Sequence, residues 1–237
     1  MSVTALMLRR DQVDQSVADG LWHCFHPVFP SVSRATFEAD RNAKSHVLVL
    51  WSGEEIVGFT ALHRHLVDTP VPAQVLCSGD TIVAPEHWGS LDWFRVWLRQ
   101  VQTWMREDPA RPCYWLLLCS GFRTYRFMSM AWRAFIPHPR RPPDAELLGL
   151  LDAWARHCYR DLYDPQHAVV RFPDPQILRP DLARIPAPRL RDPAVQCFLA
   201  ANPHHDRGDE LVCLAPITAA NQSPACRRLL PLTECGS

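Results

Sequence analysis

Residues 77–137 read CSGDTIVAPEHWGSLDWFRVWLRQVQTWMREDPARPCYWLLLCSGFRTYRFMSMAWRAFIP, and this stretch decides the fold. Its apolar runs, its Pro/Gly loop and its helical periodicity predict five elements in succession. These are a strand over about Val75–Val83, a loop over Ala84–Ser90, a helix over about Leu91–Glu107, a strand over Cys113–Cys119 and a helix over about Thr124–Phe135. Strand, loop, helix and strand at this spacing predict a βαβ unit with two parallel strands.

The loop of this unit ends where a helix begins. The free backbone N–H groups and the dipole of a helix N-terminus favour an anion. The helix itself carries an apolar stripe with spacings of three, four and seven residues, which predicts core packing on the sheet rather than a cofactor platform. The stripe consists of Phe94, Trp97, Leu98, Val101 and Trp104.

The part of the chain before this unit predicts two helices and an antiparallel meander. The helices are expected over Asp11–Phe25 and, capped by Ser31 or Ser33, up to about Asn42. Three strands joined by short turns follow, over His46–Trp51, Ile56–His65 and Ala73–Val83. The sheet is therefore expected to be mixed, antiparallel at first and parallel at the βαβ unit.

The composition changes after Pro137. A Pro- and Arg-rich linker at 138–143 precedes a one-sided helix over Glu146–Tyr159, and six prolines between 173 and 193 exclude long regular elements there. Short strands are expected at 168–172 and 211–215, and short helices at 194–201 and 221–230. We predict a core at 1–140 and a Pro-rich C-terminal extension at 141–237, packed on that core within one folding unit.

The overall charge argues against polyanionic partners. The formal net charge of the 237 residues is zero and the pI is about 7.2, so nothing in the charge predicts binding to nucleic acid or to a membrane. Lys44 is the only lysine, which we interpret as a composition bias, with arginine clamps for phosphate or carboxylate as the alternative. Nine scattered cysteines without a CxxC, and no apolar run of membrane-spanning length, predict a soluble, cytoplasmic protein with reduced thiols.

The order of the predicted elements resembles that of the GNAT superfamily of N-acyltransferases over residues 10–140. In that superfamily a V-x-P strand end precedes a Q/R-x-x-G-x-G/A loop that binds the pyrophosphate of acyl-CoA. Here Val83-Ala84-Pro85 matches, whereas only Gly89 of the loop pattern is present. In the late helix, Trp132 stands where the family often has a tyrosine acid, and Tyr125 lies two turns earlier. The resemblance implies an α/β (α+β) fold with a mixed, mostly antiparallel sheet flanked by helices.

Three stretches also resemble an uncharacterised group of bacterial proteins. They are GDTIVAPEHWG (79–89), SGFRTYRF (120–127) and GDELVCL (208–214).

The resemblance also implies roles for individual residues. A base must take the amine's proton, and Asp80 is the candidate, with a carboxylate bonded to a loop amide as the alternative. The polar run from Ser78 to Thr81 suggests a bulge or an opening in the strand. Ser120 would bind the acyl carbonyl oxygen or cap a helix, and Tyr125 would protonate the thiolate. The expected cofactor-binding residues are Val83, His87, Trp88, Gly89, Ser90 and Arg123.

The expected activity is acyl transfer from a pantetheine thioester to the amine of a small molecule, in specialised metabolism. The donor is acyl-CoA or, because the loop is degenerate, an acyl group on the phosphopantetheine arm of an acyl carrier protein. Two alternatives stay open: a ligand-binding module that has lost CoA binding, and a GNAT fold recruited to another reaction. No metal is expected, because His63 with His65, and His204 with His205 and Asp206, make incomplete ligand sets.

Overall fold

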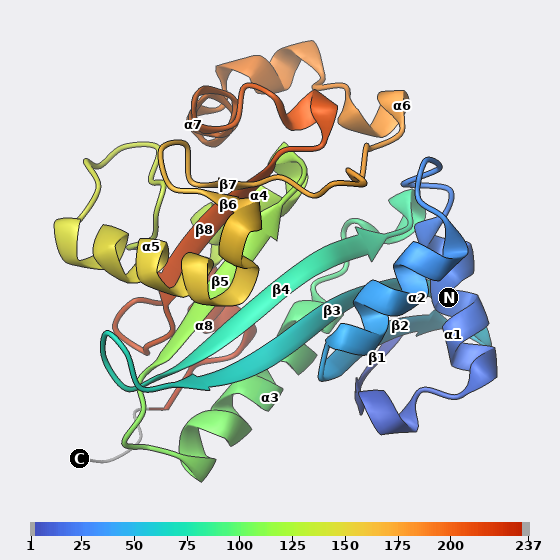
Figure 1. The fold of residues 1–237 in the computed structure, drawn as a ribbon. Helices are drawn as coiled ribbons and strands as arrows, with labels where there is room; N and C mark the ends of the chain where they lie inside the picture. Colours follow the sequence, from blue (N-terminus) through green and yellow to red (C-terminus); the bar gives the residue numbers. More distant parts are fainter. Residues whose placement is uncertain (1–2, 234–237) are drawn as a thin grey trace.

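One eight-stranded sheet organises the computed structural model, which describes residues 3–233 (Figure 1). The strand order is β1-β2-β3-β4-β5-β8-β7-β6, and β4 and β5 form the parallel pair among antiparallel ones. The strands are β1 (Val3–Arg9), β2 (His46–Ser52), β3 (Glu55–Val67), β4 (Ala73–Val83), β5 (Cys113–Cys119), β6 (Tyr163–Asp164), β7 (Val169–Val170) and β8 (Glu210–Pro216). The predicted mixed, mostly antiparallel sheet is therefore confirmed.

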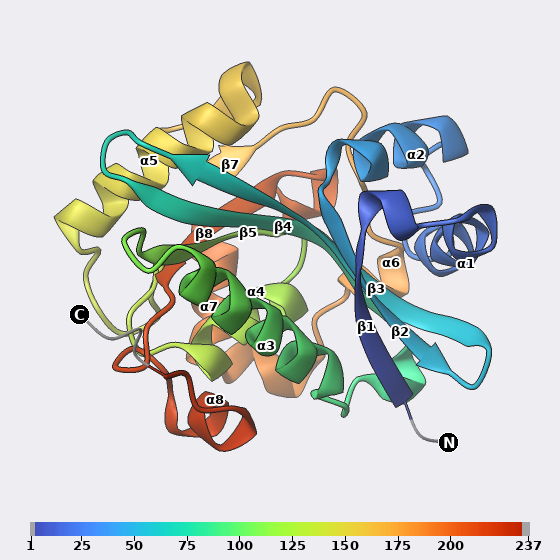
Figure 2. The same cartoon turned by 90° about the horizontal axis from the view of Figure 1, so that it is seen from below.

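Helices cover both faces of this sheet (Figure 2). Helices α1, α2 and α5 lie on one face, whereas α3, α4 and α8 lie on the other. The α-helices are α1 (Gln15–Phe25), α2 (Arg34–Ala43), α3 (Asp92–Glu107), α4 (Phe122–Ala131), α5 (Ala145–Tyr159), α6 (Pro180–Ala183), α7 (Pro193–Ala201) and α8 (Pro224–Leu229). Short 3₁₀ turns are η1 (Arg10–Gln12), η2 (Pro85–His87), η3 (Arg160–Leu162), η4 (Ala187–Arg191) and η5 (His205–Arg207).

Local sequence signals account for most of these boundaries. The Ser33 hydroxyl accepts a hydrogen bond from the Thr36 amide and so caps α2, as predicted. Asp144 caps α5 in the same way through the Leu147 amide. The whole apolar stripe of α3 is buried against the sheet, with Phe94 and Val101 fully inaccessible to solvent. None of the helices within residues 3–233 is long and apolar enough to cross a membrane.

Two parts of the architecture differ from the sequence-based expectation. The sequence analysis predicted no element before Asp11 and so missed β1, an edge strand whose side chains are half-buried or exposed. Helix α4 begins and ends earlier than predicted, because Trp132 leaves the helix and forms a β-bridge with Gln222.

The C-terminal part of the chain contributes to the same sheet. Strand β8 pairs with β5 along its whole length, from Tyr114 opposite Pro216 to Cys119 opposite Leu211. Helix α5 covers the neighbouring face through Leu151 and Trp154, which are fully buried. The segment around α6 reaches back to the turn that follows α1, where the Arg179 amide donates to the Val28 carbonyl at 2.9 Å.

Candidate functional site

Strands β4 and β5 separate at their carboxyl ends, as Figure 1 shows. Their pairing stops at Ser78 opposite Leu117, and a register shift against β3 follows directly. Asp80 sits at this bulge with a φ of 48°, a left-handed conformation that costs energy for a residue other than glycine. The Thr60 hydroxyl holds the bulge through Thr81 (2.9 Å) and the Gly79 carbonyl (3.3 Å). The predicted bulge is confirmed, and it opens the sheet.

Two cavities meet at this opening. The first, which we call the α4 cavity, has a volume of about 480 Å³ and lies between the ends of β4 and β5, the N-terminus of α4 and the segment 178–189. The second, the α2 cavity, has a volume of about 190 Å³ and lies between α2, α5 and the start of β8. Asp80 lines both cavities, so this residue lies where they adjoin.

The carboxyl group of Asp80 faces a cluster of charged side chains. Burial raises its pKa well above the ordinary value, and the carboxylate of Asp40 raises it further, whereas Lys44 opposes the shift. Burial would lower the pKa of Lys44, but Asp40 and Asp80 more than offset this, and the Lys44 ammonium donates to Asp40 at 2.9 Å. The only lysine of the chain is thus part of the site, which the interpretation as a composition bias missed.

Glu210 completes this cluster from the first residue of β8. Its side chain is buried, and burial together with Asp40 raises its pKa to about 7, while Lys44 and the Ser120 hydroxyl favour the ionised form. Sequence reasoning missed this residue, although it lies in the GDELVCL stretch. An acidic residue at the start of an apolar strand was the available signal.

We expect Glu210 to make the stability of the protein depend on pH. Its folded-state pKa lies above the ordinary 4.5, so the folded chain loses stability as the pH rises from about 4.5 through 7. The difference between these two pKa values corresponds to a loss of about 3 kcal/mol in the free energy of unfolding. Glu210→Gln should therefore flatten the decline and raise the melting temperature at pH 8, measured by circular dichroism. Glu54→Gln, at an exposed turn, is the matched control, and equal profiles for both variants would contradict the assignment.

The predicted catalytic residues are only partly brought together. Ser120 lines the α4 cavity beside Asp80 and interacts with Glu210. Tyr125 is fully buried, and its hydroxyl donates to the Pro137 carbonyl at 2.8 Å. Burial, first of all, raises the pKa of this phenol, and Cys197 raises it further. Tyr125 lines neither cavity, so its hydroxyl is not placed to protonate a thiolate there.

Most of the predicted cofactor-binding residues surround the α4 cavity. Trp88 is half exposed, and its indole N–H donates to the Val83 carbonyl at 2.7 Å. The Arg123 guanidinium lies 4.7 Å from the Trp88 ring centroid and donates to the Leu182 carbonyl. Trp88 and Arg123 therefore form a stacked pair at the cavity wall, rather than a free anion site.

The remaining loop residues do not form a phosphate cradle. His87 belongs to the 3₁₀ turn η2, outside the residues that line the α4 cavity. Gly89 has no atom within 4 Å of an added Cβ. The Ser90 hydroxyl bonds to Asp92, whose carboxylate already occupies the N-terminus of α3 together with Arg95 at 2.5 Å. This carboxylate disfavours a second anion at the same helix end.

Thiol and imidazole groups line the other side of the α2 cavity. His63, His65, Cys77 and Cys158 all face it. The sulfur atoms of Cys77 and Cys158 lie 3.1 Å apart. The hydrogen bond from Cys77 lowers the pKa of Cys158, and His65 lowers it further against the effect of burial.

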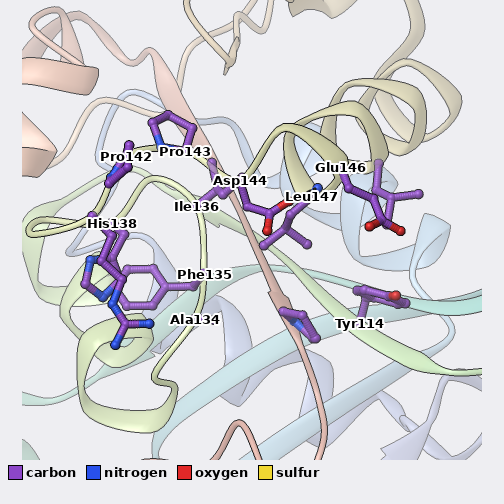
Figure 3. Close-up of a pocket in the computed structure, with 13 residues that line it drawn as sticks. Tyr114, Ala134, Phe135, Ile136, His138, Pro142, Pro143, Asp144, Glu146 and Leu147 are labelled. Carbon is purple, nitrogen blue, oxygen red and sulfur yellow. Dashed lines mark hydrogen bonds between the residues drawn. The ribbon is translucent and has the colours of Figure 1, made fainter.

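A third cavity lies elsewhere (Figure 3). It has a volume of about 570 Å³ and opens between the 138–143 linker, α5 and the start of β5. Figure 3 shows His138 beside the ring of Phe135, 4.6 Å between centroids, and the Glu146 carboxylate near Tyr114. It shares no residue with the two cavities that meet at Asp80.

Comparison with solved structures adds the following likenesses. An acyl-CoA N-acyltransferase from Pseudomonas aeruginosa is 13% identical over 48% of this chain and 79% of its own, with a TM-score of 0.37. ElaA from Escherichia coli is 15% identical over 61% and 95%, with a TM-score of 0.36. The GNAT family N-acetyltransferase YhbS from Escherichia coli, solved in complex with CoA, is 14% identical over 51% and 65%, with a TM-score of 0.36. No family model and no curated protein matches the chain.

The mixed, mostly antiparallel sheet agrees with the fold that the resemblance to the GNAT superfamily implied. An antiparallel meander enters one parallel pair, and that pair separates at a bulge in β4.

Proposed function

We propose that this protein is an N-acyltransferase that moves an acyl group from a pantetheine thioester to the amine of a small molecule. The observation that carries the proposal is the position of Asp80, which lines both cavities at the point where β4 and β5 separate. A thioester in the α4 cavity and an amine in the α2 cavity would meet beside this carboxylate. Proximity of this kind accelerates a reaction between two bound molecules.

The steps follow from this placement. The amine nitrogen attacks the thioester carbonyl carbon, and Asp80 takes the proton that the nitrogen loses. The C–S bond then breaks, the amide forms, and the thiolate leaves and takes a proton from water. A raised pKa suits Asp80 as a base, because it brings proton affinity closer to neutral pH.

The charge of the α2 cavity supports an amine as the acceptor. Asp40, Asp80 and Glu210 contribute three carboxyl groups, and Lys44 contributes one ammonium group. When ionised, these groups leave an excess of negative charge that attracts a protonated amine. The bound ammonium gives one proton to a carboxylate of the cluster before the neutral nitrogen attacks the thioester. The cavity of about 190 Å³ fits a small molecule. The direct test is to follow thiol release from acetyl-CoA and from an acyl carrier protein thioester against a panel of small amines. Absence of release from both donors with every amine would contradict the proposal.

We expect CoA itself to bind weakly, with a dissociation constant in the micromolar to millimolar range. The α3 N-terminus holds the Asp92 carboxylate, and Arg123 is stacked on Trp88. Calorimetric titration with acetyl-CoA measures this. Asp92→Asn removes the competing charge and should tighten binding by about two- to fivefold, whereas Asp11→Asn in the exposed turn η1 should leave it unchanged. Nanomolar binding by the unaltered protein would contradict the expectation and would favour CoA over a carrier-protein donor.

A further inference from the structure

Three potential metal ligands converge at one wall of the α2 cavity. They are His65 of β3, Cys77 of β4 and Cys158 of α5, and their ligand atoms all lie within 4.8 Å of one another. Among residues 3–233, no other group of three or more His, Cys, Asp and Glu side chains lies close enough together to hold a metal ion. Cys77 and Cys158 are 81 residues apart in the chain, so no spacing motif reveals them.

The fold explains why these side chains meet. In the β3/β4 register His63 lies opposite Cys77, and His65 is two residues further along the same strand. Since side chains alternate along a strand, all three point to the face covered by α5. Cys158 lies near the end of α5, where it packs against that face. The His65 ring also contacts those of His63 (4.2 Å) and His157 (5.8 Å).

We propose that His65, Cys77 and Cys158 bind a thiophilic metal ion, for which zinc is the best match. Two thiolates and one imidazole suit zinc, which takes sulfur and nitrogen ligands in tetrahedral sites. Three protein ligands leave a fourth position open. Because all three ligands line the α2 cavity, that position faces the cavity and is filled by water or by an atom of a bound ligand.

The distances fit this assignment with little movement. Zinc bonds to sulfur at about 2.3 Å, so two sulfur ligands of a tetrahedral ion lie about 3.8 Å apart. The observed separation of 3.1 Å widens by less than about 1 Å when an ion enters. A disulfide would instead need the sulfurs at about 2.05 Å. A metal site explains why the His65 ring lies beside the two sulfur atoms, whereas a disulfide does not require a third side chain, so the arrangement favours metal binding over a disulfide.

The test uses the full chain, reduced and freed of metal with a chelator. Titration with Co²⁺ should give the thiolate-to-cobalt charge-transfer band and the visible bands of tetrahedral cobalt at one ion per chain. Zn²⁺ should abolish these bands by competition. Cys158→Ser and His65→Ala should each weaken Zn²⁺ binding by roughly 100-fold or more, since even outer partners of a metal ligand contribute 10- to 100-fold.

The control is Cys24→Ser, a half-buried thiol outside the cluster that donates to the Ile56 carbonyl. It should bind Zn²⁺ like the unaltered chain, and circular dichroism should show that all variants are folded. A reduced protein without the charge-transfer band would overturn the proposal, as would zinc affinity that survives Cys158→Ser. A Cys77–Cys158 disulfide that forms on mild oxidation in the presence of excess Zn²⁺ would also overturn it and would assign a redox pair. None of these readouts depends on acyl transfer.

Discussion

Asp80→Asn is expected to lower the rate of acyl transfer by about 10²–10⁴-fold, the usual cost of removing a general base. Asparagine keeps the size of the side chain and its hydrogen bonds but takes no proton from the attacking amine. Among residues 3–233, Asp80 is the one ionisable side chain that lines both cavities. The measurement is the initial rate of thiol release with the best donor and amine from the panel described above.

A variant that shifts the pKa of Asp80 without removing its carboxyl group tests whether Asp80 acts as the base. Asp40 raises the pKa of Asp80, and Asp40→Asn also frees Lys44 to interact with Asp80. Both effects lower the pKa of Asp80. The rising limb of the pH–rate profile should therefore move to lower pH in Asp40→Asn, while Asp11→Asn in the exposed turn η1 keeps the profile of the unaltered enzyme. Full turnover by Asp80→Asn would disprove the base assignment and favour the ligand-binding alternative.

The βαβ unit and the meander could be predicted because their signals are local. The five apolar residues of the α3 stripe have helical spacing, and all of them are buried. Strand β5 was predicted with its exact limits because Cys113–Cys119 is an apolar run between turn residues. Strand β1 gives a weaker signal, since an edge strand with exposed side chains such as Leu6 lacks a continuous apolar run.

The charged cluster and the thiol cluster could not be predicted, because they depend on long-range topology. Glu210 lies near Asp80 only because β8 pairs with β5. These two strands are far apart in the sequence: Cys119 of β5 and Cys213 of β8, which are in contact, are separated by 94 residues. Lys44 reaches the site because α2 ends above the bulge of β4. No short stretch of sequence indicates that Glu210 or Lys44 lies near Asp80. Asp80 was recognisable because a polar residue interrupts an apolar strand, and that signal is local.

The C-terminal extension is expected to be indispensable for folding. A shortened chain of residues 1–138 loses β8 from the edge of β5 and α5 from the face of the sheet. That exposes Val75, Leu116 and Leu118, which are buried in the full chain. At about 1.5–3 kcal/mol for each side chain, the loss is about 5–9 kcal/mol, against a total stability of roughly 5–15 kcal/mol for a typical protein. We expect aggregation and no cooperative melting transition.

A matched pair of substitutions in α5 tests the same point in the full chain. Leu151 is fully buried against the sheet, whereas Leu148 is 42% exposed on the same helix. If the extension and the core form one folding unit, Leu151→Ala should destabilise the whole protein by about 2–5 kcal/mol and shift a single melting transition. Leu148→Ala should leave that transition unchanged. Two separate transitions, only one of which responds to Leu151→Ala, together with cooperative melting of residues 1–138, would make the extension an independent domain.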